Sequence, residues 1–162
     1  MMVTQYGAFL SPVSSPFGCI HLAWVDGALE ALDFDVHSLS NVAVEPSPAL
    51  EKTRVWIAAY FAGEPLADLP EIRLKGTPFQ QRVWSEVAQI PWGECITYAT
   101  LAKRLGSAPR AVGGALRANP IPILIPCHRV VSMSGLGGYA GASELGQARK
   151  RWLLRHEGAT CA

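Results

Sequence analysis

Residues 97–120 read TYATLAKRLGSAPRAVGGALRANP, and this stretch decides the fold of the second half of the chain. Thr97 is a capping residue ahead of a short helix, Tyr98 to Leu105, which Gly106 ends. Pro109 then opens a second helix, which must end before Asn119-Pro120. Two short helices joined by a tight glycine turn are typical of a helix-turn-helix.

The second of these helices carries few large side chains, and we call its glycine- and alanine-rich side the bare face. It holds Gly113 and Gly114, and a glycine inside a helix costs about 1 kcal/mol relative to alanine, so a compensating gain is expected. A face of glycine and alanine, including Ala111, lets another body approach the backbone. Arg110 and Arg117 favour a nucleic acid as that body, with the helix entering the minor groove and contacting phosphates. Close packing inside the protein explains the glycines equally well.

Helices with clear signals lie on both sides of this pair. Thr77-Pro78-Phe79-Gln80 combines a capping threonine, a proline at the first helical position and a glutamine at the third, which predicts a capping box. This helix runs to about Ile90. A final amphipathic basic helix covers about Glu144 to His156. The residues expected on the buried faces are Phe79, Val83, Trp84, Val87, Trp152, Leu153 and Leu154.

The start of the chain indicates a small antiparallel meander. Between Gln5 and Phe34, three short apolar and aromatic stretches are separated by hairpin signals at residues 14–18 and 26–27. Polar sequence without predicted structure follows to Pro46. Ser47-Pro48 then opens a helix that ends at Gly63 and covers one face of the meander. Its expected buried residues are Leu50, Val55, Ala58, Ala59 and Phe61.

These elements predict an α/β (α+β) protein of two small domains, which 162 residues with 49% hydrophobic content can support. Residues 1–70 form an N-terminal α/β domain, residues 71–76 a linker, and residues 77–162 a mainly helical C-terminal domain with the helix-turn-helix.

Charge is distributed unevenly along the chain, although the net charge is only +1. Residues 1–70 hold two basic side chains against eight acidic ones, a balance of −6. Residues 71–162 hold twelve against five, a balance of +7. Chance segregation is the alternative, but the pattern indicates that only the second half faces a polyanion.

A cysteine follows a rigid apolar run. Residues 120–131 read PIPILIPCHRVV, in which three prolines fix the backbone ahead of Cys127 and His128. A thiolate at Cys127 is a candidate nucleophile, and a buried, inert cysteine is the alternative. Neighbours in an extended chain point to opposite faces, so we expect a bridging water rather than a direct hydrogen bond between the two side chains. Residues 134–141, rich in glycine, read as the wall of a pocket.

The remaining cysteines, Cys19, Cys95 and Cys161, show no spacing typical of a disulfide framework or a zinc site. We therefore expect reduced cysteines, no metal and no cofactor. The N-terminus lacks a signal-peptide pattern and no long apolar run occurs, so we expect a soluble cytoplasmic protein. Glu157 ends the last helix, where the helix dipole disfavours an acid, so a specific partner is expected.

Taken together, residues 110–115 (RAVGGA), Asn119-Pro120 and residues 123–130 (ILIPCHRV) resemble the 6-O-alkylguanine-DNA alkyltransferases. The similarity covers about residues 70–158, and the N-terminal half matches in outline as an RNase H-like meander plus helix. The resemblance implies DNA repair by direct damage reversal. After base flipping, the alkyl group of 6-O-alkylguanine in double-stranded DNA passes irreversibly to a cysteine of the protein, once per molecule.

The resemblance also implies roles for individual residues. Cys127 is the alkyl acceptor, and His128 takes its proton through water. Glu157 orients His128, and Asn119 braces the active-site turn. Arg110 fills the gap left by the flipped guanine. Tyr98 rotates the target phosphate and can donate a proton to the departing oxygen. The residues implied to contact the DNA are Ala111, Gly113, Gly114 and Arg117, and those implied to surround the base are Tyr139, Leu116, Pro122 and Val130.

Two other classes of protein stay open. A helix-turn-helix regulator or an alkyltransferase-like damage sensor would bind DNA without chemistry, but such sensors lack the acceptor cysteine. A cysteine hydrolase would need a base bonded to the thiol and donors for an oxyanion. We expect a monomer that binds the minor groove with little sequence specificity. The sequence leaves open whether copies cluster along DNA and whether 4-O-alkylthymine is a substrate.

Overall fold

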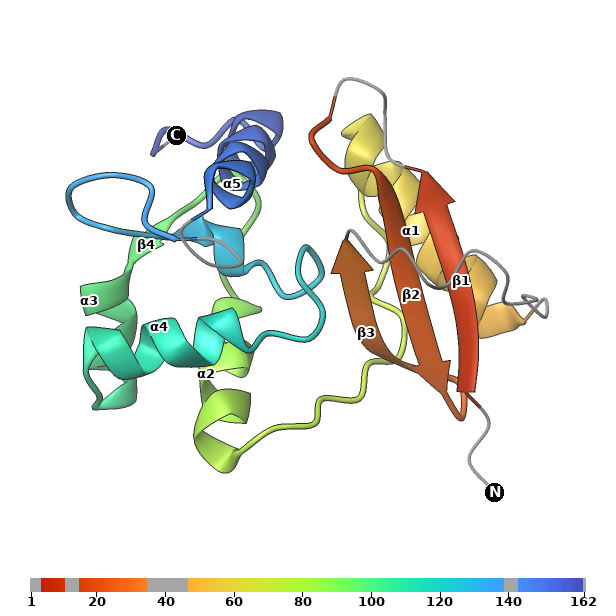
Figure 1. Ribbon diagram of the computed structural model, residues 1–162, viewed down its shortest axis with the longest axis horizontal. Helices are drawn as coiled ribbons and strands as arrows, with labels where there is room; N and C mark the ends of the chain where they lie inside the picture. The colour runs from red at the N-terminus through yellow and green to blue at the C-terminus, as the bar shows by residue number, and fades with distance from the viewer. Residues whose placement is uncertain (1–3, 11–14, 35–46, 139–142, 162) are drawn as a thin grey trace. The chain divides into compact units, whose positions relative to one another are not determined.

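The computed structural model describes residues 4–10, 15–34, 47–138 and 143–161. The chain forms two compact units, Met1–Lys75 and Gly76–Ala162 (Figure 1). The first holds an antiparallel sheet and a helix, and the second holds most of the helices. The α+β class predicted from the sequence is confirmed.

Three strands make the predicted meander: β1 (Thr4–Leu10), β2 (Cys19–Val25) and β3 (Ala28–Phe34), paired antiparallel in the order β1-β2-β3. The β2–β3 hairpin turns at Asp26 and Gly27, which both have positive φ angles of 50° and 82°. A two-residue turn of this kind matches the twist of the strands. The polar stretch predicted as structureless, residues 35–46, lies outside the described residues.

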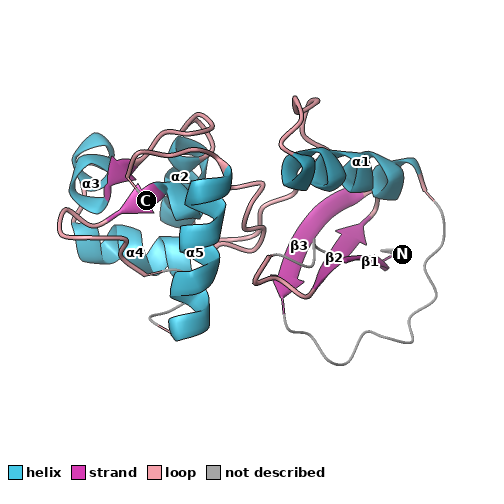
Figure 2. Cartoon of the chain, turned by 90° about the horizontal axis from the view of Figure 1, so that it is seen from above, coloured by secondary structure: helices cyan, strands magenta, loops and turns pink. Residues whose placement is uncertain are grey.

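Helix α1 (Pro48–Ala62) lies over one face of the sheet (Figure 2). The Ser47 hydroxyl accepts a hydrogen bond from the Leu50 amide at 3.2 Å, and Gly63 ends the helix at a φ of 68°, as predicted. The indole of Trp24 on β2 donates to Thr53 Oγ1 at 3.2 Å, which fixes the helix on the sheet.

The predicted buried face of α1 is partly wrong. Val55 is 54% exposed and Ala58 is exposed, whereas Trp56 and Tyr60 are buried and stack on each other at 5.7 Å. The largest side chains set the phase of the helix, because they remove the most apolar area from water. The buried residues are Leu50, Thr53, Trp56, Ile57, Tyr60 and Phe61.

The segment that follows α1 returns to the sheet. The Leu29 amide donates to the Glu71 carbonyl at 2.8 Å, and the Arg73 amide donates to the Leu29 carbonyl at 2.9 Å. Glu30 pairs with Arg73 at 3.5 Å and with Lys75 at 3.0 Å. Residues 71–73 therefore extend the first unit along the edge of β3.

In the second unit, α2 (Pro78–Val87) begins with the predicted capping box, but it ends three residues before the expected Ile90. The amides of Gln89 and Ile90 bond to carbonyls three residues back, at 3.2 and 3.0 Å, so the chain tightens into a turn. Val83, Trp84 and Val87 are buried as predicted, and Phe79 is half-buried.

The predicted helix-turn-helix is present as α3 (Tyr98–Leu105) and α4 (Pro109–Arg117). Thr97 caps α3 and Gly106 ends it at a φ of 62°. The Trp84 indole donates to the Ala115 carbonyl at 2.9 Å, which ties α4 to α2.

Two further elements complete the unit. A short parallel pair, β4 (Ile96–Thr97) with β5 (Val130–Val131), was not predicted, because strands of two residues carry no periodicity. Helix α5 (Glu144–His156) has the predicted bounds. In the described part of the chain, no helix has the length and apolar character needed to cross a membrane.

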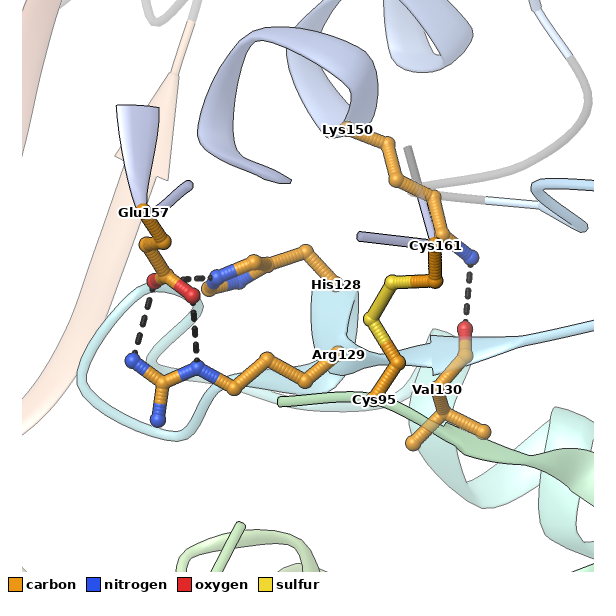
Figure 3. The surroundings of a disulfide bond; sticks show 7 residues. All are labelled: Cys95, His128, Arg129, Val130, Lys150, Glu157 and Cys161. Atoms are coloured by element: carbon orange, nitrogen blue, oxygen red, sulfur yellow. Dashed lines mark hydrogen bonds and ion pairs between the residues drawn. A yellow bond between two sulfur atoms is a disulfide. The ribbon is translucent and has the colours of Figure 1, made fainter. Parts of the chain in front are cut away.

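Cys95 and Cys161 form a disulfide with a Cα–Cα distance of 6.5 Å (Figure 3). The expectation of reduced cysteines is wrong for this pair. The two residues are 66 positions apart, so no local spacing could reveal the contact. Cys95 and Cys161 pack beside the small cluster Val131, Leu154 and Ala159.

Candidate active site

The chain between α4 and Cys127 is held by one side chain. Asn119 Nδ2 donates to the Ile125 carbonyl at 2.9 Å, and Asn119 Oδ1 accepts from the Ile121 amide at 3.0 Å. Within this loop, Ile123 has a φ of 75°, a left-handed conformation that a β-branched residue rarely adopts. Such a conformation persists only where its surroundings hold it, so the loop is a rigid support for the cysteine.

Cys127, His128 and Arg129 form a 3-10 turn rather than the extended chain expected from the sequence. The Cys127 amide donates to the Ile125 carbonyl at 2.8 Å, and the Arg129 amide donates to the Pro126 carbonyl at 3.0 Å. All three side chains are buried. With three residues per turn, successive side chains diverge by about 120°, so each one meets a different part of the protein.

His128, Arg129 and Glu157 form a buried cluster (Figure 3). His128 Nε2 lies 2.7 Å from Glu157 Oε1. Arg129 Nε donates to Glu157 Oε2 and Nη2 donates to Oε1, both at 2.9 Å, while Nη1 donates to the Ile90 carbonyl. The partner expected for Glu157 at the end of the last helix is thus a pair of side chains.

The protonation states in this cluster follow from its contacts. Burial alone raises the pKa of Glu157, but the hydrogen bonds from His128 and Arg129 outweigh it and lower the pKa to about 2. Glu157 is therefore an acceptor only, and His128 Nε2 must carry a proton. Burial lowers the pKa of His128, which Glu157 opposes and the charges of Arg129 and Lys150 reinforce.

His128 Nδ1 is therefore the free lone pair of the site. It is buried and has no hydrogen-bond partner among the described residues. Burial raises the pKa of the Cys127 thiol, and the Asn119 side chain and the Lys150 charge oppose that rise. The same turn thus carries a thiol that needs a base and, on the next residue, an imidazole nitrogen that can accept a proton.

Lys150 also lies at this site, and the sequence analysis missed it. Its fully buried ammonium donates to the carbonyls of Val130 at 2.7 Å and Gly138 at 3.0 Å, and lies 5.6 Å from the centre of the Tyr98 ring. Burial lowers the pKa of Lys150 to about 8, while the charge of Cys127 opposes this. Among the basic residues of α5, nothing in the sequence marked this lysine as buried.

Tyr98 stands at the start of α3 and faces the loop after β5. Its hydroxyl donates to the Gly138 carbonyl at 3.3 Å. A Cβ at Gly137, which has a φ of 74°, would lie 2.7 Å from the ring, so glycine permits this approach. Burial raises the pKa of Tyr98, and the nearby Cys127 adds to the rise. Tyr98, Lys150 and Cys127 are thus brought together.

The other residues expected around the base are distributed as follows. Leu116 and Val130 are buried, and Pro122 is half-buried in the loop before Cys127. Tyr139 lies outside the described residues.

The glycines of α4 face outward. A Cβ built on Gly113 or Gly114 meets no atom within 4 Å, so close packing against any described part of the protein does not explain them. Arg110, Ala111 and Arg117 are also exposed. Val112, Ala115 and Leu116 form the buried side. The bare face is thus available to another molecule.

An exposed helix-turn-helix beside a braced, buried cysteine defines a class of protein that combines macromolecular binding with thiol chemistry. The family model for the DNA-binding domain of 6-O-methylguanine DNA methyltransferase matches residues 78–159. The methylated-DNA–protein-cysteine methyltransferase of Metallosphaera sedula is 42% identical over 157 residues, 95% of this chain and 93% of that protein. The chain belongs to the 6-O-methylguanine-DNA methyltransferase family.

Other relatives extend this result. The methylated-DNA–protein-cysteine methyltransferase of Salmonella typhimurium is 51% identical over 106 residues, 63% of this chain and 60% of that protein. The crystal structure of Mycobacterium tuberculosis O6-methylguanine methyltransferase has a TM-score of 0.78 at 36% identity, covering 99% of this chain and 95% of that one. The same organism's protein in complex with DNA has a TM-score of 0.76 at 39% identity, covering 94% and 92%.

The fall in the free energy of unfolding at acidic pH should report on Glu157. Its pKa is lowered from 4.5 to about 2 on folding, so its contribution is present above pH 4.5 and is lost as the pH falls toward 2. By linkage this contribution is on the order of 3 kcal/mol. Urea unfolding should show that the free energy of unfolding of the native protein exceeds that of Glu157→Gln by the most at pH 7, and that this difference becomes smaller by pH 3. A difference that is constant with pH would contradict the assignment.

Proposed function

We propose that this protein repairs DNA by direct damage reversal, with Cys127 accepting the alkyl group of 6-O-alkylguanine once per molecule. The observation that carries the proposal is the buried cysteine beside an imidazole whose Nε2 is tied to Glu157 and whose Nδ1 is free to accept a proton. Family membership and the M. tuberculosis relative solved with DNA support DNA as the partner.

The chemistry balances without a cofactor. His128 Nδ1 takes the proton of the Cys127 thiol through a water, and the thiolate attacks the alkyl carbon in line with the departing oxygen. The carbon–sulfur bond forms as the carbon–oxygen bond breaks, and the guanine takes up a proton. The product is a thioether, which offers no carbonyl for water to attack, so the protein is not regenerated.

Tyr98 and Asn119 assist this step in the proposal. Tyr98 supplies the proton for the departing guanine oxygen, for which its hydroxyl must leave the Gly138 carbonyl. Asn119 holds the loop before Cys127 and lowers the pKa of the thiol by a side-chain hydrogen bond.

The exposed face of α4 is the proposed DNA-binding surface. A base that reacts must leave the stack, and Arg110 fills the gap. Ala111, Gly113 and Gly114 allow the helix to approach the minor groove, and Arg117 meets a phosphate. Tyr139, Leu116, Pro122 and Val130 surround the flipped base. We further propose a cytoplasmic monomer with little sequence specificity; clustering along DNA would need contacts between copies.

A transfer assay tests the proposed function. The protein is incubated with a duplex that carries one 6-O-methylguanine labelled in its methyl group. The label should move to the protein, at one methyl per molecule, and survive denaturation because it is held as a thioether. A regulator, a damage sensor or a cysteine hydrolase would leave the label on the DNA.

Binding to duplex DNA should depend strongly on salt and weakly on sequence, because α4 offers few long polar side chains to base edges. If two to four phosphates are neutralised, a fourfold rise in salt weakens binding roughly 10- to 150-fold. Arg117→Gln should reduce the slope of log affinity against log salt by about one. Arg54→Gln on α1 is the matched control and should leave it unchanged. Tight preference for one short site would favour a regulator.

A further inference from the structure

A buried arginine that the proposed chemistry does not use lies behind the His128–Glu157 pair. Arg129 is 8% exposed and donates to both oxygens of Glu157 through Nε and Nη2 (Figure 3). Its Nη1 donates to the Ile90 carbonyl. Two parallel donors on one carboxylate are the strong, geometrically specific form of this contact. Glu157 Oε1 is therefore shared between Arg129 and His128.

The sharing matters because a carboxylate can act on an imidazole in two ways. As an unpaired negative charge it favours the imidazolium, in which both nitrogens are donors and neither can accept a proton. As a hydrogen-bond acceptor it fixes Nε2–H and leaves the lone pair on Nδ1. If His128 is to act as a base, Glu157 must orient the imidazole by accepting a hydrogen bond without also converting it to the imidazolium before the reaction.

We propose that Arg129 is a positioning residue that keeps His128 neutral at rest, by neutralising Glu157 while leaving its Oε1 to orient the imidazole. This inference rests on the proposed function, in which His128 Nδ1 accepts the proton of Cys127. The hydrogen bonds of Arg129 among the described residues go to Glu157 and to the Ile90 carbonyl, so it acts on His128 through Glu157.

Among the other charged groups that face His128, Lys150 acts in the same direction as Arg129 and Glu157 acts against both. Glu157 and Lys150 face it from the last helix and its end, and Cys127 and Arg129 lie in its own turn. With the thiol protonated, two cations and one carboxylate surround the imidazole, so a further proton is disfavoured. When Cys127 becomes a thiolate its negative charge restores the balance, so His128 gains its proton as Cys127 loses one. Directions of the pKa shifts agree: burial, Arg129 and Lys150 lower that of His128, against Glu157.

The test follows the ring nitrogens of His128 by ¹⁵N NMR between pH 5 and 9, with the signal assigned by its loss in His128→Gln. In the native protein, His128 should be neutral at pH 7 with Nε2 protonated. Arg129→Gln should raise the titration midpoint by about one unit or more, since an unpaired carboxylate favours the imidazolium. Arg129→Lys, which keeps the charge, should stay near the native midpoint. Arg151→Gln removes an exposed charge from α5 and is the matched control.

Two results would overturn the inference. One is an unchanged midpoint in Arg129→Gln. The other is an imidazolium in the native protein at pH 7, which decides the matter even where the glutamine variant does not fold.

Single-turnover transfer separates this inference from the proposed function. Arg129→Gln should lose about tenfold in rate at pH 6 for each unit by which its midpoint lies above pH 6, and recover toward the native rate at pH 9. A purely structural role for Arg129 would lower the rate equally at every pH and would also reject the inference. If Cys127 is not the acceptor, no variant transfers a methyl group, yet the NMR titration still reports on Arg129.

Discussion

Replacing Cys127 by alanine should abolish methyl transfer and leave duplex binding intact. The proposed reaction forms a bond to the Cys127 sulfur, and neither alanine nor serine supplies a thiolate at neutral pH. Binding is expected to survive because Cys127 is only 9% exposed, whereas the bare face of α4 is formed by other residues. The chemistry and the affinity therefore reside on separate elements of the second unit.

The measurement is stoichiometric transfer of labelled methyl at saturating duplex, together with a binding titration on the same DNA. The native protein should reach one methyl per molecule, and Cys127→Ala and Cys127→Ser should reach none. Cys19→Ala is the matched control, because Cys19 is the other free cysteine in the described chain and lies on β2 in the first unit. Transfer near the native rate by Cys127→Ala would reject the acceptor, and loss of binding would show that Cys127 also supports the α4 surface.

Local signals sufficed wherever a helix end is set by a single residue. Ser47, Thr77 and Thr97 each cap a helix as predicted, and Gly63 and Gly106 end one. These residues act through hydrogen bonds and backbone angles within a few positions of themselves, so the local sequence is enough to predict where each helix begins or ends. The outward direction of Gly113 and Gly114 was not decided in this way, because it depends on what the rest of the fold places beside α4.

Features of the candidate site that depend on distant contacts were harder to predict. The family resemblance implied a contact between His128 and Glu157, but the sharing of Glu157 with Arg129 became visible only with the fold. Lys150 is buried because the carbonyls of Val130 and Gly138 meet its ammonium, and neither lies near it in sequence. The extended chain expected at Cys127 was wrong because the amides of Cys127 and Arg129 donate to the carbonyls of Ile125 and Pro126, and these hydrogen bonds close a turn.

Replacing Arg110 by alanine should slow repair of lesions in duplex DNA and leave reaction with a free base nearly unchanged. Arg110 is exposed in the first turn of α4, beside Ala111, so its guanidinium can extend beyond the bare surface. If it fills the gap left by the flipped guanine, its loss removes a contact that offsets unstacking, which is worth a few kcal/mol. That corresponds to a loss of roughly 10- to 1,000-fold in the rate on duplex DNA.

Single-turnover rates at saturating protein, on methylated duplex and on benzylguanine in solution, separate this role from the alternatives. The free base needs no flipping, so its rate should not change in Arg110→Ala. Arg104→Ala, an exposed arginine on α3, is the matched control for loss of positive charge. If Arg110 contacts only a phosphate, the variant binds duplex more weakly but reacts at the native rate once saturated. Equal losses on both substrates would mean that Arg110 supports the active site itself, and its place in the base stack would have to be given up.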